Sequence, residues 1–284
     1  MSDQAEKLRM RLRQKQNGKK AKVISVASGK GGVGKSNVTI NFALELMSYQ
    51  KKVLVIDLDI GMGNIDILLG LSPAYHMVDL FHRNIPIRDI IEKGPNSLPY
   101  IAGGSSLSQF FHVEKEEFAY FLSEFESLLY DYDYIFFDMG AGANEESLQF
   151  IAASDETFII TTTEPTSLTD AYSMVKHIYA MSPGMSISIL MNRALNDRQG
   201  NRSLDRIQSV VSNFLEKDVK SLGVLIDDKA VMKAVHLQSP FIQEFPASKA
   251  GKSLKAVVRA YVEGREEKGD GSFLQKLKKM VTER

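Results

Sequence analysis

The chain of 284 residues balances 35 lysine and arginine residues against 35 aspartate and glutamate residues, and it contains no cysteine. The formal net charge of zero argues against a protein that binds nucleic acid through its overall charge, and the absence of thiols excludes a cysteine-ligated iron–sulfur cluster. An apolar content of 44% is ample for a core, and no stretch is long and apolar enough to span a membrane or reads as a signal peptide, so we expect a cytoplasmic protein.

The chain begins with a strongly basic segment. Its first 22 residues contain eight lysine and arginine residues against two acidic ones, a net charge of +6. Asp3 is placed to cap a short helix whose apolar side would carry Ala5 and Leu8. That stripe is too narrow to stabilise a helix alone. We therefore predict that residues 1–21 stay disordered until a partner binds them, or that they form a basic, unstructured leader.

Residues 29–36 read GKGGVGKS and fit the phosphate-binding P-loop pattern G-x-x-x-x-G-K-[ST]. The β-branched run 23–27 predicts a strand before the loop, and the apolar residues within 37–47 predict a helix after it. This order aims backbone N–H groups and a helix N-terminus at a phosphate chain. The predicted nucleotide contacts come from the whole loop and the residue after it: Gly29, Lys30, Gly31, Gly32, Val33, Gly34, Lys35, Ser36 and Asn37.

Three residues of the loop have expected chemical roles. Lys35 is expected to reach the β- and γ-phosphates of ATP, and the Ser36 hydroxyl is expected to bind Mg²⁺. An ordinary P-loop does not need the second lysine, Lys30. With it, the pattern K-G-G-x-G-K-[ST] resembles the deviant Walker A box of the MinD/ParA ATPase family. The resemblance implies that Lys30 crosses a subunit interface to the partner's nucleotide, so that ATP holds a homodimer together.

Three carboxylates follow predicted strands. The spacing of two places Asp57 and Asp59 on one side of an extended chain, and the strand at 134–137 delivers Asp138. All three are expected at the carboxyl ends of strands, where ligands bind in open α/β sheets. The family resemblance implies that Asp59 orients the attacking water, Asp57 contacts the Mg²⁺ shell, and Asp138 binds Mg²⁺ as a Walker B aspartate. Taken singly, Asp57 or Asp59 is better explained as a solvated turn carboxylate.

Later segments indicate contacts with the base and with a second subunit. A predicted strand over 187–191 precedes Asn192 and Arg193, which by resemblance read the adenine edge and cover its ring. The next predicted strand leads to Asp227 without the proline that the family shows there, so its role stays open. The segment 162–167 resembles the family's interface loop, and it fits a turn with a helix N-cap equally well.

Strand and helix patterns alternate from about residue 22 to residue 263. Further predicted strands lie at 98–101, 157–160 and 221–224, and predicted helices at 114–130, 144–153, 167–181, 203–217 and 248–263. The alternation predicts one doubly wound α/β domain over 22–263, with a mostly parallel sheet and helices on both of its faces. By resemblance this is the MinD-like form of the P-loop NTPase fold.

A predicted linker over 264–271 leads to an amphipathic segment, 272–284. At about 100° per residue its bulky apolar side chains share one arc, with lysines outside it. The apolar residues are Phe273, Leu274, Leu277, Met280 and Val281. Such a helix is typical of a membrane surface, and two copies on a dimer would bind lipid more tightly than one. The alternative is a terminal helix docked on its own domain, and both hold if ATP releases the helix.

The first residues favour one branch of the family. The run Asp3 to Arg9 reads DQAEKLR and resembles the D-Q-A-x-x-L-R motif of the FlhG group, the MinD-like regulators of flagellar number. The resemblance implies that this run binds an FlhF-type signal-recognition GTPase and stimulates its GTP hydrolysis, with flagellar basal-body components as further partners. The residues that match the motif are Asp3, Gln4, Ala5, Leu8 and Arg9.

Taken together, the patterns predict a slow, Mg²⁺-dependent ATPase that responds to lipid and to partners. It is expected in the cytoplasm and, as an ATP-bound homodimer, at the membrane surface, with no nucleic-acid partner. The alternatives are a septum-site or partition ATPase, a nucleotide-gated scaffold that does not hydrolyse ATP, and a biosynthetic ligase on the same fold. ATP turnover with and without lipid separates the septum-site or partition ATPase and the scaffold from the FlhG-like protein.

Overall fold

The structure, a computed structural model, describes residues 20–59, 64–83, 85–103, 115–264 and 272–282. Its centre is an eight-stranded sheet in the order β3-β4-β2-β5-β1-β6-β7-β8. The strands are β1 (Lys22–Ser28), β2 (Val53–Leu58), β3 (Glu92–Lys93), β4 (Pro99–Ile101), β5 (Tyr134–Ala141), β6 (Glu156–Thr162), β7 (Ser186–Ala194) and β8 (Lys220–Ile226). Neighbouring strands pair in parallel, apart from β3, which runs antiparallel to β4. The predicted single, mostly parallel sheet is therefore confirmed.

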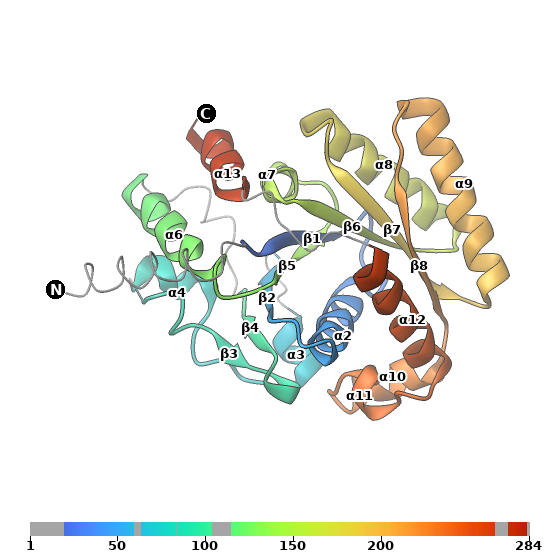
Figure 1. The fold of residues 1–284 in the computed structure, drawn as a ribbon, viewed down its shortest axis with the longest axis horizontal. Coiled ribbons are helices and arrows are strands. Elements are labelled where there is room, and N and C mark those ends of the chain that lie inside the picture. The colour runs from blue at the N-terminus through green and yellow to red at the C-terminus, as the bar shows by residue number, and fades with distance from the viewer. Residues whose placement is uncertain (1–19, 60–63, 84, 104–114, 265–271, 283–284) are drawn as a thin grey trace.

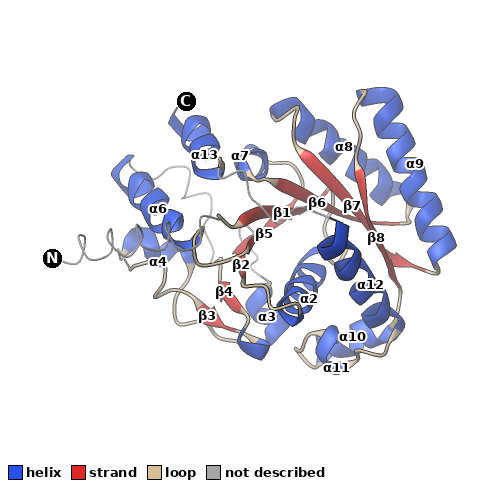
Figure 2. Ribbon diagram, viewed as in Figure 1, coloured by secondary structure: helices blue, strands red, loops and turns tan. Residues whose placement is uncertain are grey.

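Helices cover both faces of the sheet (Figures 1 and 2). One layer consists of α2 (Lys35–Ser48), α3 (Ile65–Leu69), α10 (Lys229–His236), α11 (Phe241–Glu244) and α12 (Lys249–Gly264). The other consists of α4 (Met77–His82), α6 (Lys115–Leu128), α7 (Glu145–Ala153), α8 (Pro165–Met181), α9 (Asp197–Leu215) and α13 (Phe273–Thr282). A short 3₁₀ turn, η1 (Pro95–Ser97), precedes β4.

The two helical layers explain why the central strands are apolar at almost every position. In β5, Ile135 and Phe137 pack into the core beneath α6 and α7, whereas Tyr134 and Phe136 pack into the core beneath α2 and α12. Alternate side chains point to opposite faces of a strand, and both faces are buried here. The ring of Phe42 in α2 meets the edge of Phe136 at a centroid distance of 5.8 Å, which ties the helix to the sheet.

The helix predicted at 203–217 is longer in the structure, because α9 begins at Asp197. The Asn196 side chain caps it by accepting a hydrogen bond of 2.9 Å from the backbone N–H of Gln199. Glycine is unfavourable inside a helix, yet Gly200 lies in the first turn of α9. Its place has a packing reason, since a Cβ on Gly200 would lie 2.3 Å from Cγ1 of Val224 in β8.

Short elements were not predicted from the sequence. They are β3 and the helices α3, α4, α10 and α11, none of which exceeds eight residues. Such segments have too few turns to show an apolar period, and their helices form because they pack on the domain. They fill the connections around the sheet without changing its predicted class.

The C-terminal helix α13 packs on the domain beside α6 and α7 (Figure 1). Phe273 and Leu277 are fully buried, and the Phe273 ring lies 5.1 Å from that of Phe125 and 5.4 Å from that of Phe137. Leu274 is partly buried against the same core. The structure thus shows the docked arrangement that the sequence left as an alternative to the membrane-bound one.

Several predicted segments lie outside the described residues. They are nearly all of the basic segment 1–21, with the motif residues Asp3, Gln4, Ala5, Leu8 and Arg9, most of the linker 264–271, and the side chain of Val281. Within the described ranges, no helix combines the length and the apolar character that crossing a bilayer requires.

Candidate functional site

The P-loop connects β1 to α2 at the carboxyl edge of the sheet, where the sequence placed it. Gly34 immediately precedes α2 in a left-handed conformation, with a φ of 90°, which glycine adopts at little cost. Gly29 is required for a different reason, because a Cβ there would lie 2.2 Å from the backbone oxygen of Asp170 in α8. The start of the loop is therefore seated against α8.

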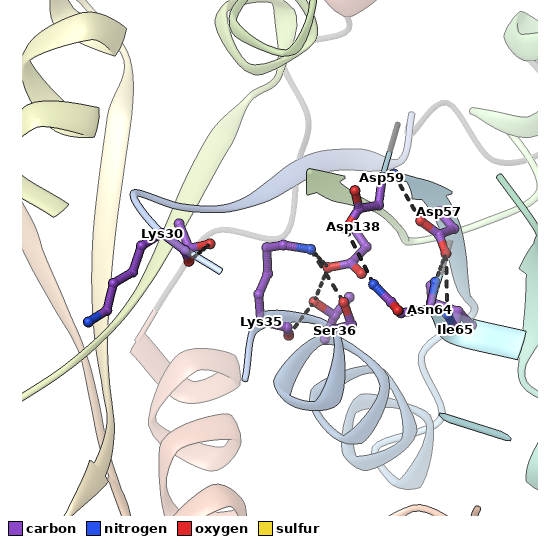
Figure 3. Close-up of polar contacts among 10 residues, drawn as sticks. Lys30, Lys35, Ser36, Asp57, Asp59, Asn64, Ile65 and Asp138 are labelled. Atoms are coloured by element: carbon purple, nitrogen blue, oxygen red, sulfur yellow. Dashed lines mark hydrogen bonds and ion pairs between the residues drawn. The ribbon is translucent and has the colours of Figure 1, made fainter. Parts of the chain in front are cut away.

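Lys35 and Asp138 form a buried ion pair at this edge (Figure 3). The Lys35 Nζ lies 2.9 Å from Asp138 Oδ1 and donates to Ser36 Oγ at 3.3 Å. The side chains are 7% and 0% exposed. The Thr39 hydroxyl donates to the same Asp138 oxygen at 3.1 Å. Two donors therefore meet at Oδ1 of Asp138.

The second oxygen of Asp138 has a different status. Oδ2 is buried and has no hydrogen-bond partner among the described residues. An unpaired carboxylate oxygen is costly in a protein interior, which makes it a marker of a ligand site. Carboxylate and hydroxyl oxygens are the donors that Mg²⁺ prefers, so Asp138 and Ser36 fit the metal that the sequence assigned to them.

Asp57 uses both of its oxygens on backbone N–H groups. Oδ1 accepts from Asp59 at 2.9 Å, and Oδ2 accepts from Asn64 at 3.0 Å and Ile65 at 3.2 Å. The side chain thereby holds the N-terminus of α3 (Figure 3). Burial, followed by the negative charge of Asp138, raises the pKa of Asp57 to about 7, against the opposing backbone hydrogen bonds and Lys35.

Asp59 lies one residue beyond the end of β2 and is half-buried. Its Oδ2 accepts from Asn64 Nδ2 at 3.4 Å. Burial is the main cause that raises the pKa of this carboxyl, and the nearby Lys35 charge lowers it. Asp57 and Asp59 therefore lie near the P-loop as expected, but Asp57 has a structural engagement that the spacing did not predict.

Lys30 points away from Lys35 and Asp138 (Figure 3). Its Nζ donates to Glu164 Oε2 at 3.0 Å and to Thr166 Oγ1 at 3.2 Å, both within the same chain. The hydrogen bond from Lys30, followed by its charge, lowers the pKa of Glu164. Glu164 is also the N-cap residue of α8, with Pro165 in its first turn. The segment 162–167 thus forms the turn and helix start that the sequence offered as one alternative.

The residues predicted at the base are only partly brought together. Asn192 reaches the P-loop, since its Nδ2 donates to the Val33 carbonyl at 2.8 Å and its Oδ1 accepts from the N–H of Arg193 at 2.9 Å. Arg193 is exposed and has a positive φ of 55°. Asp227 is exposed, and its backbone N–H donates to Ala194 at 2.8 Å. Asp227 has no side-chain contact with the P-loop that supports a role at the base.

Sequence reasoning missed one side chain near the P-loop and the partners of Lys30. Thr39, which contacts Asp138, was not singled out, and Glu164 and Thr166 were given only as part of segment 162–167, without their contact to Lys30. Thr39 lies one helical turn after Lys35, so its position on the face toward β5 was available from the helix period. No local signal indicated that Lys30 would meet Glu164.

Comparison with known proteins gives consistent results. A family model described as an AAA domain matches residues 21–189, more than half of the chain. The antiactivator FleN of Pseudomonas aeruginosa is 32% identical over 84% of this chain and 85% of its own length. The flagellum site-determining protein YlxH of Helicobacter pylori is 30% identical over 75% of this chain and 71% of its own.

The fold has solved counterparts as well. The septum site-determining protein MinD of Pyrococcus horikoshii, complexed with Mg-ADP, matches with a TM-score of 0.70 over 86% of this chain and 98% of its own. At 22% identity this similarity concerns the fold alone. The P-loop with its second lysine, the sheet order and the sequence relatives agree, and the chain belongs to the MinD/ParA family of P-loop ATPases, within its FlhG-like group.

Proposed function

We propose that the protein is an FlhG-type ATPase that binds Mg·ATP, dimerises around it, and regulates the placement or number of flagella. The observation that carries the proposal is the buried Asp138, which has one oxygen held by Lys35 and Thr39 and the other unpaired. The flagellar role is supported by the names of the relatives, an antiactivator FleN and a flagellum site-determining protein YlxH.

In the proposed ATP complex, the P-loop backbone and Lys35 hold the phosphates, and Ser36 with Asp138 would hold the metal. A bound Mg²⁺ supplies charge neutralisation at the β- and γ-phosphate oxygens. Lys35 leaves Asp138 and donates to the phosphate chain, which is the larger negative charge. Asn192 still has one N–H and one oxygen lone pair for the adenine edge after its two described contacts, with Arg193 over the ring.

Hydrolysis needs a positioned water and a fixed loop. Asp59 accepts a hydrogen bond from the attacking water, whose oxygen forms a bond to the γ-phosphorus while the bond from that phosphorus to the β–γ bridging oxygen breaks. ADP takes the electron pair of the broken bond, the attacking water gives up a proton that passes to solvent, and the products are ADP and phosphate. Asp57 accepts hydrogen bonds from the backbone N–H groups of Asp59 and Asn64. In our proposal it also contacts the water shell of the metal.

The proposed dimerisation depends on Lys30. In the single chain it pairs with Glu164, and both side chains are accessible to solvent, at 34% and 66%. An ion pair of this kind is weak, so Lys30 can exchange Glu164 for the triphosphate of a second subunit. We propose that this exchange, made twice in a symmetric dimer, makes ATP part of the interface.

Membrane attachment and GTPase stimulation use the two ends of the chain. We propose that α13, docked in this structure, is released in the ATP-bound dimer and inserts Phe273, Leu274, Leu277, Met280 and Val281 into lipid. Two helices on one dimer then act together through their high effective concentration. Residues 1–14 are proposed to bind an FlhF-type GTPase through the motif that begins at Asp3.

The test of the dimer is a Lys30→Ala protein studied by sedimentation with Mg²⁺ and a non-hydrolysable ATP analogue. We expect wild type to dimerise and Lys30→Ala to stay monomeric while still binding nucleotide, with exposed Lys252→Ala on α12 as the matched control. Unchanged dimerisation of Lys30→Ala would contradict the proposal.

A second experiment tests the N-terminal segment. Deletion of residues 1–14 should abolish capture and stimulation of an FlhF-type GTPase, and retained binding would favour a division-site ATPase.

A further inference from the structure

Thr39 is a buried polar residue of α2, one helical turn after Lys35. Its side chain is 1% exposed. Its hydroxyl lies 3.1 Å from Oδ1 of Asp138, a residue 99 positions away, and 3.0 Å from the backbone oxygen of Lys35. A buried hydroxyl costs free energy unless it is hydrogen-bonded, so one of these acceptors must receive its single proton.

The ordinary interpretation is a threonine that donates to the carbonyl four residues earlier, as such residues often do inside helices. Two features favour Asp138 instead. The carbonyl of Lys35 already faces the N–H of Thr39 in the regular helix, whereas Asp138 offers a charged acceptor, and hydrogen bonds to ionised groups are the stronger ones. The Asp138 carboxylate is also fully buried, so water cannot replace a hydrogen bond from Thr39.

We propose that Thr39 is a positioning residue for the metal-binding carboxylate, and this rests on the function proposed above. The terminal torsion of an aspartate is soft, so a carboxylate needs contacts to fix its plane. Thr39 and Lys35 together hold Oδ1, which leaves Oδ2 as the unpaired oxygen. When Lys35 moves to the phosphates, the hydroxyl of Thr39 continues to hold Oδ1, so that Oδ2 would remain available to a cation.

The experiment measures metal binding and needs no turnover. Binding of a fluorescent ADP is followed by anisotropy as free Mg²⁺ is varied, and the Mg²⁺ concentration at half-saturation is read for each variant. Thr39→Val removes the hydroxyl at nearly constant volume, and we expect the required Mg²⁺ to rise by about tenfold or more, as for other outer-shell residues of metal sites. Thr39→Ser keeps the hydroxyl and should restore the wild-type value.

Controls separate positioning from general damage. Thr157→Val alters a fully buried threonine of β6 whose hydroxyl has no partner in the described structure, and it should leave the Mg²⁺ requirement unchanged. Thr39→Ala is a second hydroxyl-free variant in case Thr39→Val folds poorly, and ADP affinity without Mg²⁺ should equal that of wild type in both. An unchanged Mg²⁺ requirement in Thr39→Val and Thr39→Ala, or equal values for Thr39→Val and Thr39→Ser, would overturn the inference. If the proposed function itself is wrong, wild type will show no Mg²⁺-dependent ADP binding.

Discussion

Two lysine–carboxylate pairs lie at opposite ends of the central strands of the sheet. Lys35 and Asp138 meet at the carboxyl edge, and Lys22 and Glu156 meet where β1 and β6 begin. Both pairs have an N–O distance of 2.9 Å, and the side chains are 7% and 0% exposed in the first and 12% and 1% exposed in the second. Distance and burial alone do not tell these pairs apart.

The hydrogen bonds of the two carboxylates distinguish the pairs. In Glu156, Oε1 accepts from Ser188 at 2.6 Å, and Oε2 accepts from Tyr261 at 3.1 Å as well as from Lys22. The Lys22 ammonium also lies 5.5 Å from the centre of the Tyr261 ring. In Asp138, one oxygen takes two donors and the other takes none.

The difference separates structure from function. A buried ion pair whose carboxylate oxygens all accept hydrogen bonds holds its strands and helices in place and needs no ligand. A buried ion pair in which one carboxylate oxygen lacks a hydrogen bond, beside a glycine-rich loop, can bind a cation through that oxygen. The comparison predicts opposite outcomes when each carboxylate is neutralised.

The largest expected effect is on catalysis at the carboxyl edge. Asp138→Asn should lower ATP turnover by about 10²–10³, the range seen when one preorganised charge-stabilising group is removed. Its unfolding free energy should fall less than that of a Glu156 variant, because loss of the Asp138 charge also removes the repulsion between Asp138 and the buried Asp57. Steady-state phosphate release and urea denaturation measure the two quantities. Turnover within threefold of wild type would break the comparison.

The next effect is on stability at the opposite edge. Glu156→Gln removes the buried negative charge beside Lys22, and this should lower the unfolding free energy by about 3 kcal/mol. ATP turnover per folded molecule should stay near the wild-type value, because Glu156 lies at the start of β6, whereas the P-loop follows the end of the neighbouring parallel strand β1. A stable variant with impaired turnover would reverse the roles assigned to the two pairs.

The third prediction is a pH dependence in the metal-free, nucleotide-free protein. The pKa of Asp57 is raised to about 7 by burial and by Asp138, from an unfolded value of about 4. The folded protein therefore binds this proton more tightly, so the contribution to stability is complete below pH 4 and is lost as pH rises through about 7. Melting curves between pH 5 and 8 should show this decline. Asp138→Asn should flatten it by removing one cause of the raised pKa, and an equally steep decline in that variant would contradict the assignment.

Much of the site was predictable from the sequence because its parts are local. The P-loop lies between a β-branched run and an apolar helix, and both took the predicted form around Lys35 and Ser36. Asp138 was found because four apolar residues precede it in a strand buried on both faces. These are statements about neighbours in the chain, which periodicity and motif spacing report directly.

The rest depends on contacts between distant segments. Lys30 meets Glu164 across 134 positions, and Thr39 meets Asp138 across 99. A motif names a lysine or a carboxylate without naming its partner, so the engaged state of Lys30 was not predictable. The two oxygens of Asp57 are likewise taken by backbone N–H groups of the turn into α3, a short helix that leaves no period in the sequence.

The central claim is that ATP and Mg²⁺ at the carboxyl edge join two copies of this chain. Its most direct test is the mass of the wild-type protein in solution, measured by analytical ultracentrifugation with Mg²⁺ and either ADP or a non-hydrolysable ATP analogue. We predict a mass of 31.7 kDa with ADP and twice that value with the ATP analogue. A protein that remains at 31.7 kDa with the saturating analogue, in solution and on lipid vesicles, would contradict the account.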